Sequence, residues 1–136
     1  MSDYNKYVTN AETRKKLGQF WTPEEIIIKM MDKIPEDTWK DPDKTFLDPT
    51  MGSGNIIIEM LKRRINEYNI DPKQALKTTY GIEINIDTYY LALNRISDFM
   101  SNYLNVEDDE IYEIIKNNFV CSDIFEWDIE KWQTKK

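Results

Sequence analysis

Apolar residues in this chain follow two spacings, which alternate along the sequence. Ile27, Met30, Met31 and Ile34 recur every three or four residues after the start signal Thr22-Pro23-Glu24-Glu25, as on the inner face of a helix. Short unbroken apolar runs are typical of buried strands. The expected helices span residues 22–34, 55–68, 85–103 and 107–116, with helical turns after 71 and within 124–132; the expected strands span 45–48, 79–84 and 118–122.

Strands separated by helices of this length predict βαβ units, an α/β fold and a parallel sheet. The length of 136 residues suits one domain of ordinary size. We expect a single domain over 1–136, with an N-terminal segment at 1–22, a core at 23–126 and a tail at 127–136.

Composition excludes several classes of function. The sequence has no histidine, which excludes a histidine general base and histidine-ligated metal sites, and the single cysteine, Cys121, excludes internal disulfides and cysteine-rich zinc sites. A lone thiol and the lack of a long apolar run favour a cytoplasmic protein without membrane contact. The net charge of -7 is poorly suited to a phosphate backbone, so we expect DNA to be bound only weakly or indirectly. The one basic cluster, Arg14-Lys15-Lys16, is either a solvated helix face or a nucleic-acid contact.

The segment from Asp48 to Gly54 is the strongest candidate for chemistry. A strand delivers Asp48 to its carboxyl end, two glycines let the backbone approach a ligand, and a helix starts at Asn55. A tight turn without a ligand is the alternative. The segment lacks the Lys-Ser or Lys-Thr of a phosphate-binding loop, and Ile57 stands where a dinucleotide fingerprint needs a small residue. Asp48 would repel a pyrophosphate but pair with an ammonium group, which favours a cationic ligand carrying a nucleoside.

Two further acidic residues follow the next two expected strands. Glu83 ends the second strand, where it could accept both hydroxyls of a ribose, with Ile84 packing against a base. Asp123 follows the third strand and could accept an exocyclic amine. Either acid taken alone could be a solvated strand end. Three acids at three successive strand ends predict one site.

These residues resemble the cofactor half of S-adenosylmethionine-dependent DNA methyltransferases of the N6-adenine type found in restriction–modification systems. The resemblance rests on four segments in order and covers about residues 14–126. They are Gly18-Gln19-Phe20-Trp21-Thr22-Pro23, Asp48-Pro49-Thr50-Met51-Gly52-Ser53-Gly54, Gly81-Ile82-Glu83 and Ser122-Asp123-Ile124.

The resemblance implies a fold, a cofactor and a set of site residues. The fold would be a truncated Rossmann-like three-layer sandwich whose short parallel sheet has the strand order 3-2-1. S-adenosylmethionine would be the cofactor, although Thr22 could serve only as a helix cap. The implied cofactor-binding residues are Phe20, Thr22, Pro23, Asp48, Pro49, Gly52, Ser53, Gly54, Glu83, Ile84, Asp123, Ile124 and Phe125.

The chain departs from the family at the catalytic motif, an Asn, Asp or Ser followed by Pro-Pro and an aromatic residue. No two prolines are adjacent in this sequence. We therefore expect a cofactor-binding module that needs a partner for methyl transfer, either a second methyltransferase subunit or another copy of the chain bound at the exposed edge strand 45–48. The alternatives are a non-catalytic regulator, a cofactor-sequestering protein, a truncated relic, or an unrelated nucleotide-binding or scaffold domain.

Overall fold

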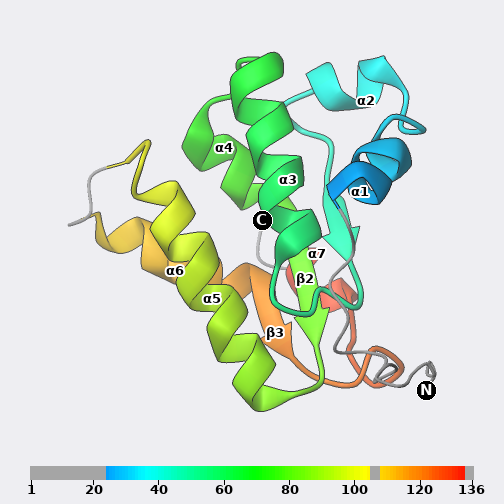
Figure 1. Cartoon of the computed structure of the whole chain (residues 1–136). Coiled ribbons are helices and arrows are strands. Elements are labelled where there is room, and N and C mark those ends of the chain that lie inside the picture. The colour runs from blue at the N-terminus through cyan, green and yellow to red at the C-terminus, as the bar shows by residue number, and fades with distance from the viewer. Residues whose placement is uncertain (1–23, 105–107, 134–136) are drawn as a thin grey trace.

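The computed structural model describes residues 24–104 and 108–133, which form helices around a three-stranded sheet (Figure 1). Among these residues, no helix is both long enough and apolar enough to cross a membrane. The helices are α1 (Glu24–Met31), α2 (Glu36–Lys40), α3 (Asn55–Lys62), a π-helical continuation of α3 (Arg63–Glu67), α4 (Pro72–Lys77), α5 (Ile86–Met100), α6 (Asp109–Asn118) and α7 (Glu130–Gln133). The strands are β1 (Phe46–Asp48), β2 (Thr79–Glu83) and β3 (Phe119–Cys121).

The sheet confirms the expected α/β class and strand order. All pairs are parallel, and the order β1-β2-β3 places the first strand at an edge. In the register, Asp48 lies opposite Gly81, and Glu83 lies opposite Cys121. The carboxyl ends of all three strands therefore lie at the same end of the sheet, where the candidate acidic residues follow.

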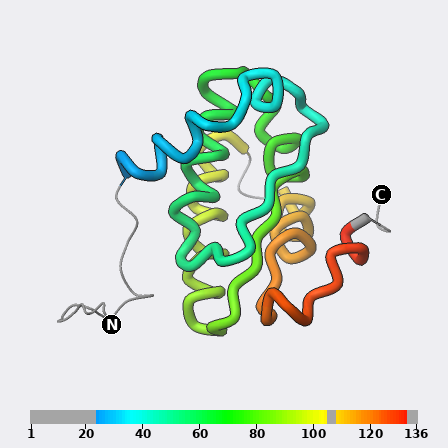
Figure 2. The backbone as a smooth tube through the Cα atoms, turned by 90° about the vertical axis from the view of Figure 1, so that its right-hand side faces the viewer, coloured from blue at the N-terminus to red at the C-terminus, as the bar shows by residue number. Residues whose placement is uncertain are grey.

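The two faces of the sheet are covered differently. Phe46 and Phe119 point into the main hydrophobic core, which is built with residues of α1, α3 and α5. On the other face, Tyr80 packs against Trp132 with 4.8 Å between ring centroids, and Trp132 packs against Trp127 at 5.2 Å. Figure 2 shows this C-terminal segment on the side of the strands opposite to α3 and α5. The covering stops short of β1, where Leu47 remains 44% exposed.

Helix boundaries follow local capping. Asp71 accepts a hydrogen bond from the Gln74 N–H at the start of α4, and Asn85 accepts one from the Thr88 N–H at the start of α5. Helix α2 was not expected, because five residues are too few to show a helical period. It forms because Trp39 is buried and stacks on Phe46, with 5.1 Å between ring centroids.

Three expectations about burial and length were wrong. Met30 was expected to face inward but is 49% exposed, because α1 contacts the core through Ile27 and Met31 only. Helix α5 ends at Met100 rather than at 103. The strand at 45–48 was expected to be buried; Phe46 and Asp48 are buried, but the expectation was wrong for Leu47, which is 44% exposed.

Arg64 joins the segment before β1 to the segment before β2. Its guanidinium is fully buried and donates to the Ala75 carbonyl at 3.2 Å and to the Thr78 hydroxyl at 2.6 Å. The group also lies 4.6 Å from the centre of the Phe46 ring. Burial lowers the pKa of Arg64 to about 10, so the side chain remains charged at neutral pH. One side chain thus fixes where two adjacent strands begin.

Replacing Arg64 should be costly, whereas replacing its neighbour Lys62 should not. Arg64→Ala leaves buried acceptors without donors and creates a cavity, so we expect the free energy of unfolding to fall by about 3 kcal/mol. Lys62→Ala removes an exposed cation paired with Glu59, and should change it by less than about 0.5 kcal/mol. Urea unfolding measures both variants. Equal effects would show that the buried contacts of Arg64 contribute no stability.

Candidate functional site

The loop between β1 and α3 crosses the carboxyl end of the sheet and is fastened to β2. The Met51 N–H donates to the Ile82 carbonyl at 2.9 Å, so the loop lies directly on the neighbouring strand. Gly52 and Gly54 have φ angles of 55° and 93°, in the left-handed region that glycine adopts without steric cost. A Cβ added at Gly52 would meet no atom of residues 24–104 or 108–133 within 4 Å. The loop therefore presents bare backbone to open space.

Gly81 in β2 is required for packing rather than for conformation. A Cβ at this position would lie 2.5 Å from the Met51 sulfur and 3.0 Å from a ring carbon of Phe119. The missing side chain lets Met51 fill the space beneath the loop, where it is buried. The glycine in the third motif thus supports the loop formed by the second.

Asp48 ends β1 with one carboxylate oxygen satisfied and the other buried without a partner. Its Oδ1 accepts the Thr50 N–H at 3.1 Å, while Oδ2 has no hydrogen-bond partner among the described residues. The residue is only 8% exposed. Burial raises the pKa of Asp48 and the charge of nearby Glu83 raises it further, against a lowering by the Thr50 hydrogen bond. An unsatisfied buried carboxylate oxygen suits a ligand that brings its own cationic donor.

Glu83 ends β2 and links the loop to the start of α5. Its Oε1 accepts the Gly52 N–H and its Oε2 accepts the Asn85 N–H, both at 2.9 Å. Each carboxylate oxygen has two acceptor positions, so both remain able to accept a further hydrogen bond. Asp48 precedes the loop and Glu83 binds it at Gly52, so the two carboxylates lie on either side of one short backbone segment.

Asp123 lies two residues beyond β3, in a turn fastened to β2. The Ser122 N–H donates to the Glu83 carbonyl at 3.0 Å, which draws the turn toward the other strand ends. Asp123 Oδ1 accepts the Phe125 N–H at 2.9 Å. Phe125 is 93% exposed, and Ile84 and Ile124 are also exposed. The strand ends therefore combine carboxylates with apolar side chains that have no cover.

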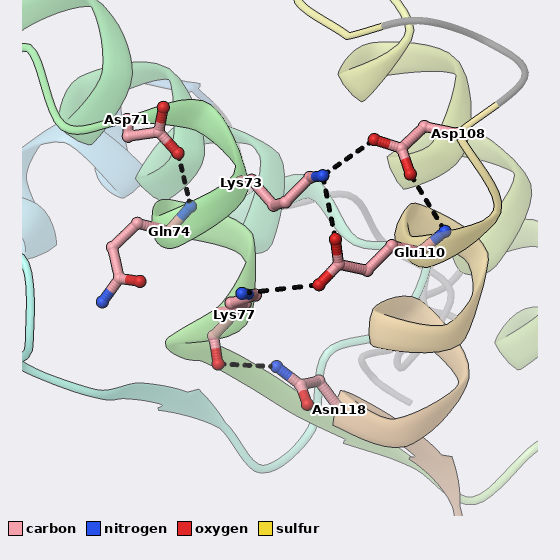
Figure 3. Close-up of polar contacts among 7 residues, drawn as sticks. All are labelled: Asp71, Lys73, Gln74, Lys77, Asp108, Glu110 and Asn118. Atoms are coloured by element: carbon pink, nitrogen blue, oxygen red, sulfur yellow. Dashed lines mark hydrogen bonds and ion pairs between the residues drawn. The ribbon is translucent and has the colours of Figure 1, made fainter.

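A cavity formed by described residues lies away from this site, at the amino ends of the strands. It measures about 740 Å³ and is lined by Thr45, Tyr80, Trp132 and residues of α4 and α6. Beside it, Lys73 pairs with Asp108 at 2.8 Å and with Glu110 at 3.0 Å (Figure 3). These ion pairs link α4 to the start of α6, so the charges of Lys73, Asp108 and Glu110 partly neutralise one another. Of its charged lining residues, Lys77 and Glu110 pair with each other at 3.5 Å, and we do not assign this cavity a function.

Comparison with known proteins identifies the family of this chain. A family model described as N-6 DNA Methylase matches residues 4–130. The chain belongs to this family. Type II methyltransferase M.VspI of Vibrio sp. (strain 343) is 31% identical over 130 residues, which make up 87% of this chain and 29% of that protein. The chain thus spans less than a third of that relative's length, and no solved structure matches it significantly.

The comparison confirms the resemblance to N6-adenine DNA methyltransferases that the motifs predicted. Family membership does not test the role of each residue, and those roles remain predictions. The structure brings the predicted residues after the three strands to one end of the sheet. Pro49 and Ser53 lie half-buried in the glycine loop. Phe20, Thr22 and Pro23 lie outside the described residues.

Sequence reasoning missed two residues that shape this end of the N-6 DNA methylase fold. Asn85 caps α5 and donates its own N–H to Glu83. Arg95, in the middle of α5, donates to Ser53 and to Asn55. The Asn85 cap carries a sequence signal, because asparagine before a helix is a common capping residue. Nothing in the sequence distinguishes Arg95 from a solvated cation on a helix face. Among the described residues, no cluster of His, Cys, Asp and Glu could hold a metal ion.

Neutralising Asp48 should stabilise the fold. Because the pKa is higher in the folded protein than its ordinary value of 3.8, the charged form is penalised on folding. That penalty is fully present above the folded-state pKa and vanishes below 3.8. Asp48→Asn keeps an acceptor for the Thr50 N–H. We expect the variant to unfold at higher urea concentration than the parent at pH 7, with the difference shrinking as the pH falls toward 4.

The matched control is Asp98→Asn, which changes an exposed carboxylate on α5. It should leave the urea midpoint nearly unchanged at both pH values. A loss of stability in Asp48→Asn at pH 7 would contradict the assignment of a strained, buried charge.

Proposed function

We propose that this chain binds S-adenosylmethionine at the carboxyl ends of its strands and forms the cofactor half of an N6-adenine DNA methyltransferase. The observation that carries the proposal is the pair of carboxylates on adjacent parallel strands beside a glycine loop. One of the two, Asp48, has a buried oxygen without a partner in the part of the chain that the structure describes. Membership of the N-6 DNA methylase family supports the same cofactor.

The described residues fit the chemical groups of this cofactor. Asp48 would accept the methionine ammonium group, and the open space in front of Gly52 would let the ligand approach the loop backbone. Glu83 would accept the ribose hydroxyls with its remaining acceptor positions. Ile84 and Phe125 would flank the adenine, and Asp123 would accept its amino group. The sulfonium, when bound, supplies an electrophilic methyl group.

Transfer of that methyl group to DNA needs residues that this chain lacks. An adenine amino group is a poor nucleophile, so an enzyme must accept its protons and hold the flipped base against an aromatic side chain. The 136 residues contain no adjacent prolines and hence no Pro-Pro-aromatic segment. We propose that a segment outside these residues supplies the motif, within a cytoplasmic restriction–modification system. The partial coverage of the Vibrio methyltransferase supports this.

The edge of β1 is the proposed joining surface. Among the described residues, β1 pairs only with β2, so its other side keeps unpaired backbone groups, and Leu47 is exposed on the uncovered face. Such an edge accepts another strand. We propose that a second methyltransferase polypeptide or another copy of this chain pairs there. Because the chain carries a net charge of -7, the partner would make most of the contact with DNA.

The second candidate function is cofactor binding without turnover, in a regulator, a sequestering protein or a truncated relic. The absence of a Pro-Pro-aromatic segment from the 136 residues favours it. The two candidates agree on cofactor binding and differ in whether a partner restores methyl transfer.

Replacing Glu83 should weaken cofactor binding to a degree that depends on the new side chain. Glu83→Ala removes two charge-assisted acceptors, so we expect affinity for S-adenosylmethionine and S-adenosylhomocysteine to fall by on the order of 2–4 kcal/mol. Glu83→Gln keeps an acceptor for the Gly52 N–H and should lose less. Glu113→Ala, at an exposed position on α6, is the control and should bind as the parent does. Isothermal titration calorimetry measures all four proteins, and equal affinity in Glu83→Ala would refute the ribose assignment.

Methyl transfer should require a second polypeptide. With labelled S-adenosylmethionine and duplex DNA, we expect no transfer by this chain alone, and transfer when a polypeptide carrying an Asn/Asp-Pro-Pro-aromatic segment is added. Leu47→Lys places a charge on the open face beside the β1 edge and should abolish that transfer without changing cofactor affinity. Ile26→Lys, on the exposed side of α1, is the control and should leave transfer intact. Transfer by the chain alone would contradict the proposal.

A further inference from the structure

Arg95 is a cation on α5 that contacts three atoms of the glycine loop region. Its Nη1 donates to the Ser53 carbonyl at 2.8 Å, to the Ser53 hydroxyl at 3.0 Å and to Asn55 Oδ1 at 2.7 Å. Ser53 stands between the two glycines of the loop, and Asn55 is the first residue of α3. All three acceptors therefore lie where the loop turns into the helix.

The position of Arg95 is unusual for a residue that only stabilises a helix. A cation near the N-terminus of α3 is disfavoured by the helix dipole, whose positive end lies there. The N-cap residue of α3 is Gly54, which has no side chain to cap the helix. Asn55 directs its side-chain oxygen at Arg95. The hydrogen bonds must therefore outweigh an unfavourable charge, and what they hold in place is the loop.

The loop is held from its other side by β2. The Gly52 N–H donates to Glu83 and the Met51 N–H donates to the Ile82 carbonyl. Two glycines with left-handed backbone conformations make this segment flexible unless it is held on both sides. Glu83 holds the first glycine, and Arg95 holds the residue before the second.

We propose that Arg95 is a positioning residue that keeps Met51–Asn55 in the arrangement that receives S-adenosylmethionine. It acts through the Ser53 carbonyl and Asn55 and makes no contact with the ligand. The inference rests on the proposed cofactor binding and adds the residue on α5 that prepares the loop for it. Helix α5 thereby becomes part of the binding site, although its exposed residues look like an ordinary solvated helix face.

The effect of removing Arg95 on ligand affinity depends on the fraction of molecules in which the loop keeps its binding arrangement. If the loop keeps its arrangement about a tenth of the time in Arg95→Ala, the dissociation constant for S-adenosylhomocysteine rises roughly tenfold. Arg95→Lys retains a cationic donor that reaches fewer acceptors, and should recover part of this loss. Asn55→Ala removes one acceptor. Its effect should be less than additive with that of Arg95→Ala, because both variants break the same contact.

Arg63→Ala is the matched control. Arg63 is also a half-buried helical arginine, but it pairs with Asp32 at 2.9 Å on the outer side of the fold. Its removal should lower thermal stability while leaving the dissociation constant unchanged. If a general loss of stability were enough to weaken binding, the dissociation constant would rise in both variants. If Arg95 positions the loop, the dissociation constant rises only in Arg95→Ala.

The experiment combines titration calorimetry with hydrogen exchange of the full chain without ligand. In Arg95→Ala we expect weaker binding of S-adenosylhomocysteine and faster exchange of the Gly52 and Gly54 amides, while the amides of Ile57 and Leu61 in α3 keep their protection. Unchanged binding in Arg95→Ala, with a parent protein that binds, overturns the role of Arg95 and leaves the proposed function standing. A parent protein that binds neither cofactor nor product overturns the proposed function and, with it, this inference.

Discussion

The parallel pairing of β1 with β2 is the constraint on which the rest of the site depends. Because the strands run in the same direction, Asp48 and Glu83 reach the same end of the sheet, although 35 positions separate them in the sequence. The crossover helices and the buried Arg64 fix where each strand begins, and hence where each carboxylate arrives. A register shift of one residue would turn one acid to the opposite face. The contacts at the amino ends of the strands therefore determine where the carboxylates at the carboxyl ends lie.

The buried carboxylate of Asp48 destabilises the fold, because one of its oxygens has no hydrogen-bond partner among the described residues. Buried polar groups in proteins are nearly always hydrogen-bonded, so an orphaned carboxylate oxygen needs an explanation. A ligand that brings an ammonium group supplies one, since it completes the hydrogen bonding and neutralises the charge. Glu83 differs, because its oxygens are already engaged by backbone N–H groups. The first acid is prepared to gain a partner, and the second already organises the loop.

Much of the fold was predictable because it depends on local signals. Caps, the spacing of apolar residues and the glycine turn located the strands and most helices to within a few residues, and the strand order followed from the family resemblance. The acids after each strand could be found for the same reason. The features that the sequence analysis did not predict depend on contacts between residues far apart in the sequence. Helix α2 exists because Trp39 stacks on Phe46, and Arg95 matters because α5 crosses beside the glycine turn. No pattern along the chain records either contact.

The shortness of β1 has a consequence for how the molecule meets other chains. Strand β1 has three residues, and only Leu47 points to the face that the described residues leave open. An edge this short offers too little backbone to pair along an extended ladder. The short edge strand thereby disfavours edge-to-edge aggregation into fibres, because short edge strands are one of the means by which sheet proteins avoid it. A strand that docks there must draw most of its affinity from side chains beyond the ladder. Recognition of the proposed partner at this edge would therefore be selective for a chain of matching shape.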